Sequence, residues 1–324
     1  MSAMMGKVCV TGAAGFIGGH LAEALLELGH EVVGLDDFSS GKRENAALLL
    51  RHPGFRLVEG SIEDPRAVEE AVAGARYVFH LAAMPSVPVS MKEPVRTNAV
   101  NVGGTVNVLE ASRRHQVART VLACSCAAYG DGPEQPKHEG LAVRPGSPYA
   151  AQKIAAEIYA QTYTVAYGVP CVALRFFNVY GPRQDPRSDY AAAIPRFATR
   201  LLAGQRPIVF GDGQQTRDFV HVSDVVRANL LAATAAAAPG HVINVASGHS
   251  ASLLELIGLL RHAVGPEAAW LEVEHQASRA GDLRHSSADI SRAKALLGYA
   301  PRVPLAEGLA QLVASLRAGL AIAA

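Results

Sequence analysis

A glycine-rich turn near the N-terminus, VTGAAGFIGGHL, constrains the fold of this chain more than any other feature. The β-rich run KVCVTG leads into the turn, and the helical pattern GGHLAEALLELGH follows it. Gly12, Gly15 and Gly18 have no side chains, so the backbone can approach a pyrophosphate whose charge the helix N-terminus favours. This order of strand, turn and helix predicts a dinucleotide-binding unit. A glycine turn that serves only helix packing is the alternative.

Asp36 ends the next β-rich run, EVVGLDD. A carboxylate at this place can accept hydrogen bonds from the hydroxyls of an adenosine ribose, and it would repel a 2′-phosphate. The sequence therefore predicts NAD rather than NADP as the dinucleotide.

Strand and helix patterns alternate along the first half of the chain. Further β-rich runs are RYVFHLAA, RTVLACS and CVALRFFNVYG, and helical patterns cover 98–114 and 149–167. The alternation predicts an α/β fold, a Rossmann-type doubly wound parallel sheet with helices on both faces. After about residue 178 glycine, proline and charged residues become denser. We expect this part to form a smaller C-terminal α/β lobe over the carboxyl ends of the strands, where such sheets bind ligands.

Charge and composition exclude several classes of function. The 324 residues include 30 basic and 29 acidic side chains, which gives a formal net charge of +1 without a basic block. Nucleic acid is therefore not an expected partner, because its binding depends on concentrated positive charge. The four cysteines have neither metal-ligand nor disulfide spacing, which predicts no metal site and a reducing, cytoplasmic location. The apolar runs at both ends are short and interrupted, so neither a signal peptide nor a membrane span is expected.

The motif SPYAAQK places Tyr149 and Lys153 on one face of a predicted helix. Free tyrosine has a pKa near ~10, so a nearby cation must favour the phenolate if Tyr149 is to take a proton at neutral pH. Lys153 is such a cation, and its ammonium could also hold a nicotinamide ribose. Ser125 ends the run RTVLACS, where its hydroxyl can bond a substrate hydroxyl. The three residues predict a proton-transfer site; the alternative is a solvated pair beside an ordinary strand end.

Nine segments spread over nearly the whole chain form a set: TGAAGFIG, DDFSSG, HLAA, NVGGT, SCAAYGD, SPYAAQK, LRFFNVYGPRQDP, GDGQQTRDFVHVSD and RAGDLRHSSADISRAKALLGYAP. The set resembles the extended short-chain dehydrogenase/reductase family and, within it, the NAD-dependent UDP-hexose 4-epimerases, especially members that act on N-acetylated sugars. The resemblance implies reversible epimerisation at C4 through a 4-keto intermediate. Tyr149 would take the C4 hydroxyl proton, and tightly bound NAD would accept the C4 hydride and return it to the opposite face of the sugar.

The resemblance also implies which residues bind the cofactor. They are Gly12, Gly15, Phe16, Ile17, Gly18, Asp36, Asp37, Ser39, Ser40, Gly41, Ser61, Ile62, Leu81, Ala82, Ala83, Asn101, Tyr149, Lys153 and Phe177. Ser61 stands where the family usually has an aspartate that binds the adenine amino group, so we expect a weaker contact there.

A second implied set binds the UDP-sugar. It consists of Ser86, Ser125, Asn178, Gln184, Phe210, Arg217, Arg279, Asp282 and Ser286. The two arginines suit the diphosphate because each guanidinium donates paired hydrogen bonds, although they could instead be structural partners of Asp218 and Asp282. Phe210 could stack on uracil.

Ser286 matches a gate to the sugar pocket that is bulky in enzymes confined to glucose and galactose. Serine there leaves room for an N-acetyl group, with Ser86 and Gln184 as polar partners. The resemblance therefore implies UDP-GlcNAc and UDP-GalNAc as substrates, alongside UDP-Glc and UDP-Gal. Arg183, in the same polar loop as Gln184, is expected at the surface.

Cys126 and Ala127 occupy the places where dehydrating and decarboxylating relatives carry an acidic residue, which disfavours those reactions. A UDP-glucuronate or UDP-pentose 4-epimerase remains an alternative, and so does a non-catalytic nucleotide-binding sensor or scaffold.

By analogy with relatives, we expect a homodimer formed through the helices near 98–114 and 149–167. We also expect an NAD-binding domain of residues 1–177 with roughly 218–246, and a nucleotide-sugar lobe of 178–217 and 247–324.

Overall fold

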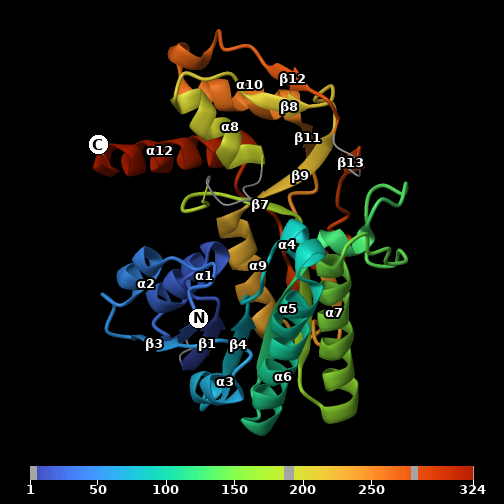
Figure 1. Ribbon diagram of the computed structural model, residues 1–324. Helices are drawn as coiled ribbons and strands as arrows, with labels where there is room; N and C mark the ends of the chain where they lie inside the picture. The colour runs from blue at the N-terminus through green and yellow to red at the C-terminus, as the bar shows by residue number, and fades with distance from the viewer. Residues whose placement is uncertain (1–5, 186–192, 279–283, 324) are drawn as a thin grey trace.

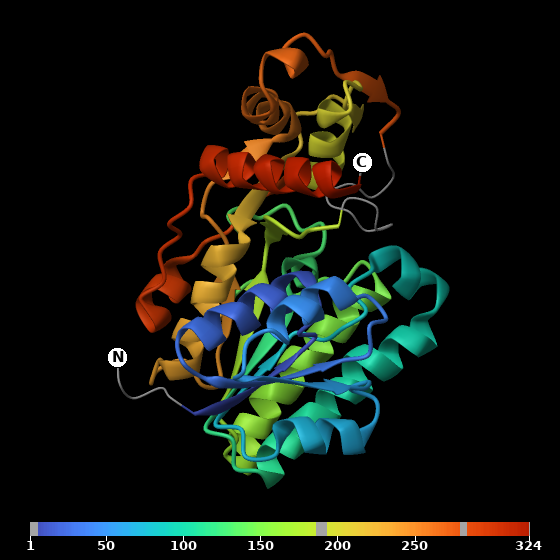
Figure 2. The same ribbon diagram turned by 90° about the vertical axis from the view of Figure 1, so that its left-hand side faces the viewer.

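The computed structural model describes residues 6–185, 193–278 and 284–323, which form a lower body around a large sheet and a smaller upper body (Figures 1 and 2). The large sheet has seven strands in the order β10-β6-β5-β4-β1-β2-β3, all paired in parallel. These strands are β1 (Lys7–Thr11), β2 (Glu31–Asp36), β3 (Phe55–Glu59), β4 (Tyr77–His80), β5 (Arg119–Ser125), β6 (Cys171–Phe176) and β10 (Val242–Val245). This arrangement confirms the predicted Rossmann-type α/β fold.

Helices cover both faces of the sheet because its central strands are apolar on both sides. In β1, Val8 and Val10 join one core with α1 (Phe16–Glu27) and α9 (Val222–Thr234). Cys9, between them, joins the opposite core with α3 (Pro65–Val72) and α6 (Thr105–Arg114). Successive side chains of a strand point to opposite faces, so one short apolar run supplies both cores. The remaining helices of this body are α2 (Arg43–Leu49), α4 (Val87–Lys92), α5 (Pro94–Asn98), η2 (Cys126–Tyr129), α7 (Pro148–Tyr167) and α11 (Ser291–Leu297).

Two predicted elements differ from the structure, and the strand β3 was not predicted. The helix expected at 98–114 consists of the end of α5, a π-helical segment η1 (Ala99–Gly104), and α6. The strand expected for CVALRFFNVYG is divided into β6 and β7 (Asn178–Tyr180), because the chain leaves the large sheet after Phe177 and pairs with β9 (Thr216–His221). The edge strand β3 was not expected, since only Phe55 and Val58 of its five residues are buried and they do not form an alternating pattern.

The upper body contains two small sheets. β9 pairs with β7, β11 (Ser250–Ser252) and β13 (His285–Ser286), and β8 (Ile208–Phe210) pairs with β12 (Glu274–Gln276). α8 (Ala193–Leu202), α10 (Leu253–Val264), η3 (Pro266–Ala268) and α12 (Leu305–Ala323) complete this body around a separate apolar core. β9 continues directly into α9, so the chain passes from the upper body back to the large sheet (Figure 1). Within the described residues, every helix is too short or too polar to cross a membrane.

Candidate active site

The turn between β1 and α1 has a geometry that glycine permits. The φ angle of Gly12 is +72°, and a Cβ atom there would lie 2.8 Å from the backbone nitrogen of Ala82. A Cβ atom on Gly18 would lie 1.9 Å from the carbonyl oxygen of Gly12. No side chain caps the first turn of α1, whose preceding residue is Gly15. Backbone N–H groups at this helix start are therefore placed to bind an anion such as a pyrophosphate.

Asp36 lies directly beside this turn at the end of β2. Its side chain is buried, and it accepts hydrogen bonds from the backbone N–H groups of Ala14 and Phe38, each at 2.9 Å. Burial raises the pKa of Asp36, while these two amide bonds act in the opposite direction. A Cβ atom on Gly41 would lie 2.6 Å from the carboxylate, so the loop wraps tightly around it. Each carboxylate oxygen has a second lone pair that can accept from a ribose hydroxyl, so the residues fit NAD.

His80, at the end of β4, takes part in a closed hydrogen-bond network with Thr11 and Thr105. The hydroxyl of Thr105 donates to the backbone carbonyl oxygen of Asn101. Its oxygen therefore accepts a hydrogen bond from His80 Nε2, at 3.0 Å. The other ring nitrogen, Nδ1, then accepts from the hydroxyl of Thr11 at 2.8 Å. Both ring nitrogens are thus used by a neutral imidazole. Burial, followed by the charge of Lys153, lowers the pKa of His80 to about 3. His80 therefore has a structural role in this network.

The depressed pKa of His80 predicts acid sensitivity. An unfolded histidine binds a proton near pH ~6.5, whereas the folded one does so only near 3, so stability is lost as the pH falls from about 6.5 towards 3. Between pH 7 and 4.5 the wild-type free energy of unfolding should fall by about 2–3 kcal/mol more than that of His80→Gln, which cannot titrate. Urea unfolding at the two pH values measures the difference. Equal losses in both proteins would contradict the prediction.

Ser125, Tyr149 and Lys153 lie together at the carboxyl end of β5. Tyr149 lies in the first turn of α7, which Ser147 caps by accepting a hydrogen bond from the N–H of Ala150 at 3.2 Å. The side chain of Tyr149 is hydrogen-bonded to that of Ser125. Lys153 lies one turn along the helix, nearly buried, and its ammonium donates to the carbonyl oxygen of Ala123 at 2.8 Å.

The pKa of Tyr149 differs from the value expected from the sequence, where a nearby cation was expected to favour the phenolate. Burial raises the pKa of Tyr149 to about 12, although the hydrogen bond from Ser125 acts to lower it. Burial also lowers the pKa of Lys153, which Cys124 and Glu157 partly oppose. Tyr149 is therefore a neutral phenol in these surroundings, and it needs further positive charge nearby to act as a base.

Three of the residues expected to hold the sugar nucleotide are brought together by β9. Ser286 on β13 is the register partner of Arg217, and Asn178 on β7 is the partner of Phe219. Paired residues share a face, as do residues two apart, so Asn178, Arg217 and Ser286 lie on one face of the small sheet. Burial raises the pKa of the Cys126 thiol, and the charge of Arg217 opposes this rise, so the guanidinium lies near the end of β5.

The carboxylate of Asp218, the alternative partner of Arg217, is fully buried and accepts hydrogen bonds from Ser247 N, Ser247 Oγ and Gly248 N at 2.7–2.9 Å. Ser86 caps α4 by accepting from Val89 N at 2.9 Å. Gln184 donates to the Val179 carbonyl at 3.2 Å, while its buried Oε1 has no hydrogen-bond partner among the described residues.

Other predicted residues lie elsewhere in or around the site. Phe210 ends β8 and is partly buried, Phe177 is buried beside Tyr129, and Asn101 uses its amide to hold Met84 and Gln152. Arg279 and Asp282 lie outside the described residues.

Two contacts of the site are not visible in the sequence motifs. Ser90, fully buried, accepts from the N–H of Tyr149 at 3.1 Å and thereby fixes the start of α7. Gln135 donates to the carbonyl of His285 at 2.8 Å and accepts from the N–H of Ser287 at 3.0 Å, so it holds the backbone on both sides of Ser286. Each joins segments far apart in the sequence, and no local pattern indicates such a pairing.

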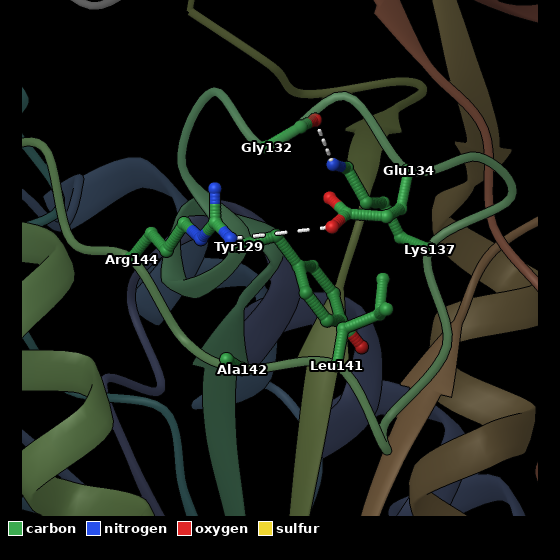
Figure 3. A pocket seen from close by; sticks show the side chains of 7 residues that line it. All are labelled: Tyr129, Gly132, Glu134, Lys137, Leu141, Ala142 and Arg144. Carbon is green, nitrogen blue, oxygen red and sulfur yellow. Dashed lines mark hydrogen bonds and ion pairs between the residues drawn. The ribbon is translucent and has the colours of Figure 1, made fainter.

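The loop between η2 and α7 encloses a small pocket, shown in Figure 3. Its lining residues are Tyr129, Gly132, Glu134, Lys137, Leu141, Ala142 and Arg144. The polar groups bind within the protein: Lys137 donates to Gly132, Arg144 lies 4.0 Å from Glu134, and Tyr129 donates to Asn244 at 2.7 Å. We therefore assign this loop to the scaffold between Ser125 and Tyr149.

Comparisons with known proteins agree with this geometry. Residues 8–246 match the model of the NAD dependent epimerase/dehydratase family. A UDP-glucose 4-epimerase from Mycolicibacterium smegmatis is 42% identical over 309 residues, covering 95% of this chain and 97% of the relative. A UDP-N-acetylglucosamine 4-epimerase from Methanobrevibacter ruminantium, solved with UDP-N-acetylmuramic acid, is 36% identical with a TM-score of 0.91, over 97% and 98% of the two chains. A UDP-glucuronic acid 4-epimerase from Bacillus cereus is 32% identical with a TM-score of 0.88, over 96% and 99%.

Proposed function

Because the chain belongs to the NAD-dependent epimerase/dehydratase family, we propose that it interconverts UDP-GlcNAc and UDP-GalNAc at C4 and also accepts UDP-Glc and UDP-Gal. The convergence of Ser125, Tyr149 and Lys153 carries the proposal. Dehydration needs a further acid or base. Ala127 cannot supply one, and burial raises the pKa of Cys126 to about 12, so its thiol stays neutral.

In the proposed reaction Tyr149 removes the proton from the C4 hydroxyl and later returns it to the C4 oxygen of the epimer. Bound NAD supplies the hydride acceptor and donor at C4. Ser125, bonded to Tyr149, would orient the sugar hydroxyl. Lys153, one turn along the same helix, would supply positive charge towards the phenolate as the proton leaves.

The sugar nucleotide would lie along the face of the small sheet that carries Asn178, Arg217 and Ser286. Arg217 would bind the diphosphate through its guanidinium fork. The Oε1 of Gln184 has no partner among the described residues, which supports acceptance of an N-acetyl group, because this oxygen can accept a hydrogen bond from the acetamido N–H. The small side chain of Ser286 would leave space for the acetyl carbons.

Substrate profiling tests this proposal. The purified protein would be incubated separately with UDP-GlcNAc, UDP-GalNAc, UDP-Glc, UDP-Gal and UDP-glucuronate, and the products resolved by proton NMR. Interconversion of the acetylated pair is expected. The Ser286→Tyr variant should reduce kcat/KM for that pair by about a hundred-fold and leave the plain pair within a few-fold, since added bulk excludes a fitting group. Turnover of UDP-glucuronate alone would replace the proposed substrate, and no turnover with added NAD would reject the epimerase function.

We further propose that two chains associate through α6 and α7. Val165 and Ile158 on α7 are 87% and 56% exposed, and Val95 on α5 is 85% exposed, although all three are apolar. Ile158 and Val165 are seven residues apart and therefore lie on one face of α7, and an exposed apolar helix face is typical of a subunit interface. The division into an NAD domain and a sugar-nucleotide lobe, with the boundaries given above, also remains a proposal; separate expression of residues 1–177 joined to residues 218–246 would test it.

Introducing charge on this face should separate the subunits. Val165→Glu is expected to shift the mass in sedimentation equilibrium from that of a dimer to that of a monomer, because a carboxylate would be buried without a partner. Trp270→Glu, at a position 73% exposed in the upper body, is the matched control and should stay dimeric. A wild-type protein that is monomeric at micromolar concentration would refute the proposed association.

A further inference from the structure

The glycine turn at 12–18, Asp36 and the loop at 37–41 together form what we call the cofactor cradle. The loop at 181–185, which follows β7, is bonded to both sides of this cradle. On one side, the carbonyl of Pro182 accepts from His20 Nε2 at 2.9 Å, and Arg183 reaches Glu23 Oε2 at 2.5 Å. His20 and Glu23 belong to α1, the helix whose first turn faces the pyrophosphate position. This corrects the expectation that Arg183 is an ordinary surface residue, since its side chain is only 20% exposed.

On the other side, Asp185 Oδ2 lies 2.9 Å from Lys42 Nζ. Lys42 follows the loop that wraps around Asp36, and its N–H donates to the carbonyl of Ala14 in the glycine turn at 2.9 Å. The second anchor therefore lies at the ribose end of the cradle. In both views the segment after β7 lies between α1 and the upper body (Figures 1 and 2).

At the first anchor, His20 Nε2 lies 2.9 Å from the carbonyl oxygen of Pro182 and 3.3 Å from Arg183 Nε. The shorter contact, in which Nε2 donates to Pro182, sets the tautomer. Because Nε2 of His20 donates to Pro182, Nδ1 is free to accept from the guanidinium of Arg183 at 2.5 Å. This requires a neutral ring, and burial lowers the pKa of His20 to about 4. Arg183 also has a φ angle of +67°, a conformation that is unfavourable for a residue with a side chain. The contacts on α1 hold it there, and such strain is retained where a structure over-determines it, often at ligand clamps.

We propose that the 181–185 loop is a clasp that closes over the cradle and slows the release of NAD. It is anchored at the helix beside the pyrophosphate position and at the loop beside the ribose carboxylate, so a bound dinucleotide leaves only after one anchor opens. The same loop directly follows β7, the strand that carries Asn178. It therefore connects the cofactor site to the face of the small sheet that would bind the sugar nucleotide. The inference goes beyond the proposed function and depends only on NAD binding.

Charge reversal at the second anchor, Lys42 and Asp185, tests the clasp in an assay that contains no sugar nucleotide. Holoenzyme would be diluted into an NAD-scavenging dehydrogenase with its alcohol substrate, so that the NADH formed reports the rate of NAD release. Lys42→Glu and Asp185→Lys should each release NAD about three- to ten-fold faster than wild type, because each places like charges together. The double variant Lys42→Glu/Asp185→Lys restores opposite charges and should return to within about two-fold of wild type.

Two further variants complete the test. Arg183→Gly removes the contacts on α1, tolerates the positive φ angle, and should also speed release. Arg56→Glu reverses a charge in the exposed ion pair with Glu70 and should leave release unchanged. Wild-type rates in the single variants would overturn the clasp. Fast release that the double variant does not restore would also overturn it, because Lys42 would then act on NAD directly.

Discussion

Tyr149→Phe is expected to lower kcat for epimerisation by about a thousand-fold, within the range that one general acid–base group supplies. The phenylalanine ring fills the same space, and the backbone contact of residue 149 with Ser90 does not involve the hydroxyl. The fold and NAD binding should therefore survive, and only the proton transfer is lost. Single-turnover kinetics with UDP-Glc, together with the NAD content of the purified variant, measure both properties.

The control is Tyr159→Phe, which removes a hydroxyl from the same helix at a position that is 40% exposed. It should retain activity within about two-fold, as is usual for surface substitutions. If Tyr149→Phe kept wild-type turnover, Tyr149 would have no part in the chemistry. If it lost NAD as well as activity, its effect would be on cofactor binding, and the catalytic role would need Ser125→Ala as a separate test.

Arg175→Ala is expected to lower the free energy of unfolding by about 3–5 kcal/mol, since removing one partner leaves the other charge buried. Arg175 and Glu157 are 4% and 3% exposed, and they share two hydrogen bonds of 2.8 and 2.7 Å. Burial opposes the charge of Arg175, but its bonds to Glu157 prevail and raise its pKa. Glu157 also lies one turn after Lys153 on α7, so activity should fall too.

A second arginine–glutamate pair, similar in geometry but exposed, isolates the effect of burial on stability. Arg43 and Glu59 also share two hydrogen bonds, and Arg43 lies 4.2 Å above the ring of Phe38, much as Arg175 lies 4.6 Å above that of Tyr129. That pair is exposed, so Arg43→Ala should destabilise far less in the same urea titration. Glu157→Leu combined with Arg175→Met should recover most of the loss. Equal effects of the two alanine variants would contradict the assigned role of burial.

The sequence predicted the parts of the site that short segments build. The glycine turn, Asp36 and the pair Tyr149 and Lys153 each lie within one strand–turn–helix unit, where spacing fixes geometry. A parallel sheet then brings the end of β5 to the start of α7, so the convergence of Ser125 with Tyr149 also followed from strand order. The sequence was less successful where the chain leaves the sheet, as at Phe177, because apolar residues continue through the change of direction.

The sequence by itself determined the α/β fold and the preference for NAD, and it predicted the proton-transfer trio, since these depend on local periodicity and residue chemistry. Only the tertiary structure decided that Gln135 holds the strand of Ser286, that Arg183 and Asp185 anchor a loop across the cradle, and that Tyr149 is a neutral phenol. These properties come from contacts between distant segments and from burial. Both depend on how the two bodies pack, and no single stretch of sequence encodes them.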